Sequence, residues 1–128
     1  MTIALWCVLV AALLPFPFAL AAKSSRRFDN ATPREYIEQT TGWRKRAHWA
    51  QVNGFETFPP FAAAVVIAHL VAGPNATADA LAVAFIVLRV LYGLCYIADK
   101  ATLRSTVWAD GFACVIGLFV VAARTPGA

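Results

Sequence analysis

Four long apolar stretches dominate the sequence and constrain its fold more than any other feature. They run over Thr2–Ala22, Ala47–Ala72, Ala78–Ala98 and Ser105–Ala123. A helix needs about 20 mainly apolar residues to cross a hydrocarbon core roughly 30 Å thick, and each stretch is long enough. In lipid, only helices and closed barrels satisfy their own backbone hydrogen bonds. The pattern therefore predicts an all-α integral membrane protein, with four spanning helices bundled in a single domain over residues 1–128.

Composition supports a location in the membrane. Of the 128 residues, 60% are hydrophobic and only 14% are charged, whereas soluble domains carry about a quarter charged residues. The net charge of +4 does not indicate nucleic acid, because the basic residues lie between the apolar stretches. Cations in such places set the topology and contact anionic lipid. We therefore expect membrane lipid as a partner, and no nucleic acid.

The connections predict how the helices are arranged. Gly73–Thr77 and Asp99–Arg104 are short, so the second, third and fourth helices are expected to be antiparallel neighbours. Asp99–Arg104 and the longer connection Lys23–Arg46 lie on one side of the membrane and together carry nine lysines and arginines. The other side has only Arg124. Because cytoplasmic loops are enriched in these residues, we expect both termini to face away from the cytoplasm.

The first stretch resembles a secretory signal only in its position. It has no basic segment before it, and it is too long for the apolar part of a signal peptide. We therefore expect it to remain as a spanning helix. Pro15 and Pro17 should kink this helix, since a proline removes a backbone hydrogen bond.

The connection 23–46 has a helix signal of its own. Thr32 is placed as an N-cap, Pro33 as the first helical residue and Glu35 as the glutamate of a capping box. We expect Gly42 to end this short helix, which would lie among the lipid head groups.

Cysteines and histidines predict no metal centre. Cys7, Cys95 and Cys114 lie within apolar stretches, at spacings that match no metal or redox motif. We expect them to be small buried hydrophobic residues. His48 and His69 lie near opposite ends of the second helix, too far apart to share a metal ion, and packing or interfacial roles are expected.

Ionisable side chains inside the spans are the candidate functional residues, because charges in hydrocarbon are costly. The candidates within the spans are Glu56, Arg89 and Asp110. Asn53 and Glu56 share one face of the second helix. Arg89, Tyr92 and Tyr96 share one face of the third helix. We expect these faces to meet, so that Glu56 or Asp110 neutralises Arg89.

The polar faces have two interpretations, which the residues alone do not separate. One is a buried network that fixes helix packing and the register of an oligomer, without any ligand. The other is an anion-binding cleft between helices that opens toward the basic side. Asp110, in the first two turns of the fourth helix, is either a partner of Arg89 or a residue exposed to water.

Two motifs carry a resemblance to a known family. In Arg46–Phe61, an asparagine and a glutamate three residues apart precede an aromatic-proline pair, here Asn53, Glu56 and Phe58-Pro59. The second motif is Arg89-x-x-Tyr92-x-x-x-Tyr96, followed by Leu103-Arg104-Ser105. With the number of spans and the loop lengths, these motifs resemble the MAPEG family (membrane-associated proteins in eicosanoid and glutathione metabolism), and most closely its small bacterial members.

The resemblance implies a fold, a ligand and a site. It implies a homotrimer of four-helix bundles in a bacterial inner membrane, with glutathione bound between adjacent subunits near the cytoplasmic side. Five residues would bind glutathione: Asn53, Glu56, Arg89, Tyr92 and Tyr96. The first two would hold its backbone and amine, and the other three would hold its carboxylates or line the cleft. Arg104, with Ser105, would stabilise the thiolate, which is the nucleophilic form of a thiol.

One position departs from the pattern of the glutathione-using members. They carry an arginine four residues before the motif asparagine, where this chain has Trp49, and Arg46 is the nearest basic residue. One hypothesis is a glutathione-dependent transferase or peroxidase that acts on lipophilic electrophiles. The second is a non-catalytic trimer of the same fold that binds another anionic or lipid-like ligand. A small transporter is the third, although Thr2–Ala22 lacks the ionisable residue that such proteins usually place in their first span.

Overall fold

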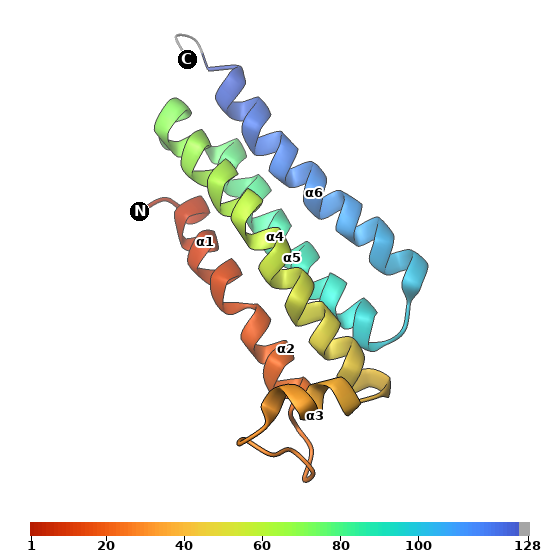
Figure 1. Cartoon of the computed structure of the whole chain (residues 1–128). Coiled ribbons are helices and arrows are strands. Elements are labelled where there is room, and N and C mark those ends of the chain that lie inside the picture. The colour runs from red at the N-terminus through yellow and green to blue at the C-terminus, as the bar shows by residue number, and fades with distance from the viewer. Residues whose placement is uncertain (126–128) are drawn as a thin grey trace.

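The computed structural model describes residues 1–125, and this part of the chain consists of helices joined by turns and loops (Figure 1). Its helices are α1 (Ile3–Leu13), α2 (Pro15–Ala22), α3 (Pro33–Gln39), α4 (Gly42–Ala72), α5 (Ala76–Ile97) and α6 (Ala101–Ala123). The α1–α2 pair forms one rod, and this rod, α4, α5 and α6 are each long and apolar enough to cross a membrane. The chain is therefore an integral membrane protein with the all-α four-helix bundle that the sequence predicts.

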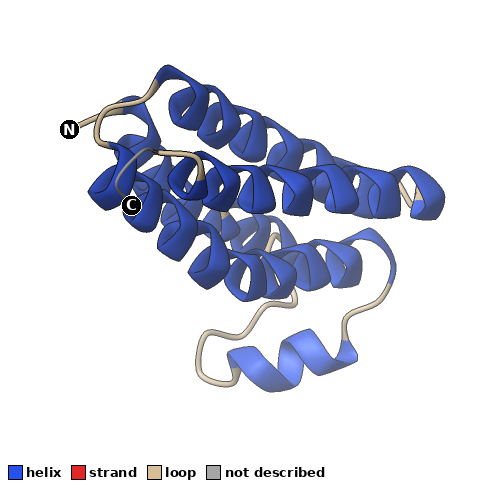
Figure 2. Cartoon of the chain, turned by 90° about the horizontal axis from the view of Figure 1, so that it is seen from above, coloured by secondary structure: helices blue, strands red, loops and turns tan. Residues whose placement is uncertain are grey.

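The four rods lie side by side, and the short α3 lies at one end of the bundle (Figures 1 and 2). Helices α4 and α5 pack against each other, and each of them also contacts the α1–α2 rod and α6. The start of α1 and the end of α6 lie toward the end of the bundle away from α3 (Figure 1). We call the end that carries α3 and the α5–α6 turn the basic end, because nine lysines and arginines lie in its two connections.

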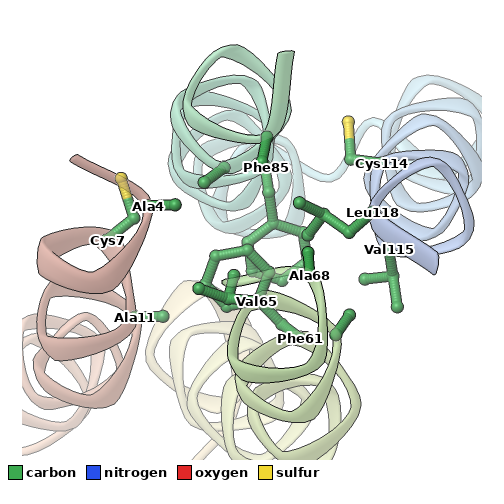
Figure 3. Packing of buried hydrophobic residues seen from close by; sticks show 13 residues of the cluster. Ala4, Cys7, Ala11, Phe61, Val65, Ala68, Phe85, Cys114, Val115 and Leu118 are labelled. Carbon is green, nitrogen blue, oxygen red and sulfur yellow. The ribbon is translucent and has the colours of Figure 1, made fainter. Parts of the chain in front are cut away.

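The hydrophobic core lies where α4 and α5 meet the other two rods (Figure 3). The rings of Phe61 and Phe85 stack with centroids 3.9 Å apart, and Leu118 is fully buried beside them. Small residues let the helix backbones approach closely, as is usual between membrane helices. The buried alanines of this core include Ala64, Ala68 and Ala82. Many large apolar side chains instead face outward, as a surface in contact with lipid requires.

The first rod is interrupted at Leu14, and α2 restarts with Pro15. The break lies where the prolines were expected to act, although the Leu14 backbone itself stays helical (φ −57°, ψ −33°). Glycines of the neighbouring helices make room for the rod at this level. A Cβ atom on Gly54 would lie 2.9 Å from Pro15, and one on Gly93 would lie 1.9 Å from the ring of Phe18. The second of these contacts is too close for a Cβ atom unless the Phe18 ring moves.

Two details of α3 differ from the sequence prediction. Pro33 opens the helix as expected, but the Thr32 side chain makes no capping hydrogen bond. The backbone of Thr32 (φ −130°, ψ 59°) is away from the extended geometry of an N-cap, so the predicted capping box is wrong. Gly42 does not end this helix either. It has a φ of +64° and begins α4, whereas α3 ends at Gln39.

Side chains, rather than a glycine, satisfy the end of α3. The Thr40 hydroxyl donates to the Tyr36 carbonyl at 2.8 Å. Lys45 Nζ donates to the carbonyls of Ile37 and Glu38 at 2.9 and 3.1 Å. The last carbonyls of a helix have no partner within it, and a lysine nearby is a favourable donor.

The three basic residues at the start of α4 each join a different segment. Arg44 donates through Nε and Nη2 to the Ser24 carbonyl, at 3.3 and 2.9 Å. Lys45 bonds the end of α3, as described above. Arg46 donates through the same two atoms to the Ile97 carbonyl at the end of α5, at 3.3 and 3.0 Å. We call Arg44-Lys45-Arg46 the basic staple, because it joins the first connection, α3 and α5 to α4.

Candidate functional site

The polar faces predicted on α4 and α5 meet inside the bundle. Arg89 of α5 is only 7% exposed. Its Nη2 donates to Asn53 Oδ1 of α4 at 2.9 Å, and Asn53 Nδ2 donates to Glu56 Oε2 at 3.0 Å. The Asn53 side chain thus accepts a hydrogen bond from the Arg89 guanidinium and donates one to the Glu56 carboxylate. The two hydrogen bonds together fix the orientation of the Asn53 amide.

The expected direct neutralisation of Arg89 is therefore wrong in its details. The guanidinium reaches the Glu56 carboxylate through the amide of Asn53, because Asn53 is the residue of α4 that faces α5 at this depth. Asp110 lies exposed on α6 and does not line the cavities next to Arg89. Asp110 is therefore not a partner of Arg89 within the single chain.

An aromatic ladder links Arg89 to Arg104. The Arg89 guanidinium lies 4.2 Å from the Tyr92 ring centroid. Tyr92 packs edge-on against Tyr96, with centroids 5.6 Å apart, and the Arg104 guanidinium lies 4.2 Å from the Tyr96 centroid. Cations over aromatic faces are attracted by the electrons of the ring. The ladder therefore holds two guanidiniums in fixed places, one buried and one nearer the basic end.

Trp49 occupies the position where the glutathione-using members carry an arginine. Its ring centroid lies 6.0 Å from that of Tyr96, and the side chain is 46% exposed. Arg46, the nearest basic residue, is bonded to the Ile97 carbonyl through two nitrogens. Arg46 is thus part of the basic staple and does not take the place of the missing arginine.

Tyr92 and Tyr96 of the ladder, together with Asn53 and Glu56, line an open cleft on the outer face of the bundle. This aromatic cleft has a volume of about 330 Å³ and is lined by Trp49, Val52, Asn53, Glu56, Tyr92 and Tyr96. Its walls offer a carboxylate, an amide and aromatic faces, with Arg104 over Tyr96 beside it. A ligand with both an amine and carboxylates finds complementary groups there.

A second, mainly apolar cavity of about 160 Å³ lies on the other side of Asn53 and Arg89, between α4, α5 and α6. Sequence reasoning did not single out the residues that form its apolar wall. They include Pro60, Phe85, Trp108 and Phe112. The rings of Trp108 and Phe112 stack with centroids 5.5 Å apart. Trp108 and Phe112 are four residues apart in the sequence. This spacing could have indicated that they share a helix face.

Ser105 is the one predicted site residue that the structure does not bring to this cluster. It is exposed, and its hydroxyl donates to the Ala101 carbonyl one turn earlier at 3.2 Å. Consecutive residues point about 100° apart around a helix. With Arg104 directed at Tyr96, Ser105 faces elsewhere. The other six predicted residues, Asn53, Glu56, Arg89, Tyr92, Tyr96 and Arg104, form one connected group.

The protein is thus a multi-pass membrane protein with an aromatic cleft in the half of its bundle nearer the basic end. Two arginines, Arg89 and Arg104, lie against the tyrosines of that cleft. A sequence model of the MAPEG family matches residues 3–124, nearly the whole chain. The protein therefore belongs to the MAPEG family. A direct comparison with curated protein sequences finds no match.

Proposed function

We propose that this protein is a glutathione-dependent transferase or peroxidase that acts on lipophilic electrophiles from the bilayer. The observation that supports this most strongly is the single open cleft that collects Asn53, Glu56, Tyr92 and Tyr96, with Arg89 and Arg104 at the two ends of its aromatic ladder. The family as a whole is associated with glutathione. Glutathione carries one amine and two carboxylates, which suit this set of groups.

The residues have different roles in this proposal. Glu56 accepts hydrogen bonds from the amine, and Asn53, held between Arg89 and Glu56, presents a fixed amide to the peptide backbone. Arg89 is buried and acts mainly by orienting Asn53, so it is a positioning residue. Arg104 is less buried and lies at the basic end of the ladder, where its charge stabilises a thiolate.

Glutathione supplies a thiol nucleophile when it is bound. A guanidinium beside sulfur favours the thiolate over the thiol, which increases the reactive population at neutral pH. Tyr92 and Tyr96 exclude water from one side of the cleft and hold Arg104 by ring contact. The apolar cavity beyond Asn53, walled by Trp108 and Phe112, offers a surface for a lipophilic second substrate.

We further propose that the protein is a homotrimer in a bacterial inner membrane, with both termini away from the cytoplasm. The cleft lies on an outer face, where its Trp49 and Glu56 are exposed. Polar groups facing hydrocarbon are costly, and a neighbouring copy packed over the cleft removes that cost. A detergent-corrected mass equal to three chains is expected, whereas a mass of one or two chains would contradict the trimer.

A second function is favoured by one specific observation. Trp49 stands where an arginine is expected, and Arg46 is bonded elsewhere, so the cleft has one cation fewer than the glutathione-using pattern. A non-catalytic trimer that binds another anionic or lipid-like ligand fits that difference. The same binding experiment separates the two functions.

The test is calorimetric titration of glutathione into purified protein, with Glu56→Gln beside the parent. Saturable binding is expected, with about tenfold weaker affinity in Glu56→Gln, because hydrogen bonds to charged groups contribute about 1.5–3 kcal/mol. Asp110→Asn is the matched control, since it makes the same chemical change at an exposed carboxylate outside the cleft. The absence of binding at millimolar glutathione would exclude the transferase and favour the second function.

A further inference from the structure

The first connection contains a pocket that the proposed function does not use. It has a volume of about 300 Å³ and lies between the loop after α2, helix α3 and the start of α4, at the low end of the range for small-molecule sites. Two arginines line it, Arg27 and Arg44. We call it the connection pocket.

The lining of the connection pocket carries positive charge and neutral polar groups. Besides the arginines, its lining includes neutral hydrogen-bonding side chains, those of Ser25, Tyr36, Gln39 and Thr41. Three carboxylates occur in the same connection, on Asp29, Glu35 and Glu38. Among the described residues, however, no carboxylate belongs to the lining. Two cations without an opposing anion, surrounded by hydroxyl and amide donors, make a site that favours an anion.

Part of this lining is already held in place. Arg44 is bonded to the Ser24 carbonyl through Nε and Nη2, a contact that does not use Nη1, and its guanidinium lies 4.5 Å from the Trp43 ring centroid. Tyr36 is fixed edge-on against Phe28, with centroids 5.3 Å apart. An anion entering the pocket therefore meets donors whose positions are set beforehand, which lowers the entropic cost of binding.

The place of the pocket in the fold indicates the kind of anion. It lies at the basic end, where α4 begins before the apolar part of its span, at the level expected for lipid phosphates. Arginine binds phosphate oxygens through paired hydrogen bonds. We propose that the connection pocket is a binding site for a phosphate group, carried by an anionic phospholipid or by a soluble phosphate compound.

The decisive variants are two neighbouring arginines. Arg26 and Arg27 are both exposed and belong to the same loop, but only Arg27 lines the pocket. Arg27→Gln and Arg26→Gln therefore remove the same charge from the same loop. Glutathione affinity serves as the control for folding, since neither residue belongs to the aromatic cleft.

The experiment measures binding of three probes to the purified protein: short-chain phosphatidylglycerol, short-chain phosphatidylcholine and inorganic phosphate. Native mass spectrometry counts bound lipid, and calorimetry follows inorganic phosphate. We expect Arg27→Gln to weaken binding about tenfold, because it removes charge-assisted hydrogen bonds. Arg26→Gln should change binding by less than about twofold, since an exposed charge is screened by salt.

Each outcome decides the proposal. Binding of phosphatidylglycerol alone that depends on Arg27 assigns the site to an anionic lipid head group. Binding of inorganic phosphate as well, with the same dependence, assigns it to phosphate irrespective of carrier. Equal losses in the two variants, or binding of phosphatidylglycerol that neither variant changes, would mean a diffuse basic surface and would overturn the proposal. So would the absence of binding by all three probes. Because glutathione binding is measured separately, failure here leaves the transferase proposal standing.

Discussion

The arginine behind the aromatic cleft and the arginines of the basic staple satisfy their hydrogen-bond donors in different ways. Behind the cleft, Arg89 is buried and donates to a side chain, Asn53. In the staple, Arg44 and Arg46 are half-buried and donate to backbone carbonyls at the ends of other segments. Within a span the carbonyls are used by the helix itself, so a buried cation needs a polar side chain. At helix ends free carbonyls are abundant.

This difference predicts where the loss of a hydrogen-bond partner lowers the free energy of unfolding most. A guanidinium inside the bundle cannot turn to water, whereas a carbonyl at the basic end can. Substitutions in the cleft should therefore affect stability more than those in the staple, although both regions lose hydrogen bonds of similar length.

The largest effect is expected for Asn53→Leu. It leaves the buried Arg89 guanidinium without its recorded partner, at a cost of about 3 kcal/mol in the free energy of unfolding. Arg89→Met should cost less, because it leaves no buried charge. Unfolding in mixed detergent micelles measures both, and the double variant closes a thermodynamic cycle. Additive losses in the double variant would show that the two side chains are not coupled.

A smaller loss of stability is expected for Arg46→Gln, about 1–2 kcal/mol, because the Ile97 carbonyl regains a hydrogen bond from water. Arg26→Gln provides the matched control, and it should leave the midpoint of unfolding unchanged. If Arg46→Gln destabilised the protein more than Asn53→Leu, the proposed contrast between the two regions would be wrong.

Arg104→Gln addresses chemistry rather than stability. We expect about tenfold less thiolate in the bound glutathione at neutral pH, because a cation beside sulfur favours the ionised form. The ultraviolet absorbance of the thiolate measures this directly. Lys100→Gln, a loss of charge at the N-cap of α6 one turn before Arg104, should leave the absorbance unchanged. An unchanged signal in Arg104→Gln would remove the catalytic role proposed for Arg104.

The smallest effect is expected for Trp49→Arg. A third guanidinium at the cleft should strengthen glutathione binding about threefold, as an exposed charge pair contributes about 0.2–1 kcal/mol. Trp49→Phe keeps the aromatic contact with Tyr96 and should leave affinity unchanged. Calorimetry measures both variants. Weaker binding in Trp49→Arg than in Trp49→Phe would mean that the tryptophan itself contacts the ligand.

Sequence reasoning found most of the candidate site because its signals were local. Helical spacing put Asn53 and Glu56 on one face of α4, and Arg89, Tyr92 and Tyr96 on one face of α5. The family resemblance, not helical spacing, paired Ser105 with Arg104, although adjacent residues on a helix point in different directions. Sequence reasoning also missed the apolar wall of Trp108 and Phe112, since an aromatic pair in a span is equally typical of a surface facing lipid.

The sequence by itself determined the four spans, the all-α class and the break at Pro15, because apolar length and the missing amide of proline are properties of local segments. Only the tertiary structure decided that Asn53 stands between Arg89 and Glu56, that Arg46 bonds the end of α5 and that Asp110 remains exposed. Those outcomes depend on how far each helix is rotated and shifted against its neighbours. Rotation and shift follow from packing between distant residues, such as Phe18 against Gly93 and Phe61 against Phe85, which no local pattern encodes.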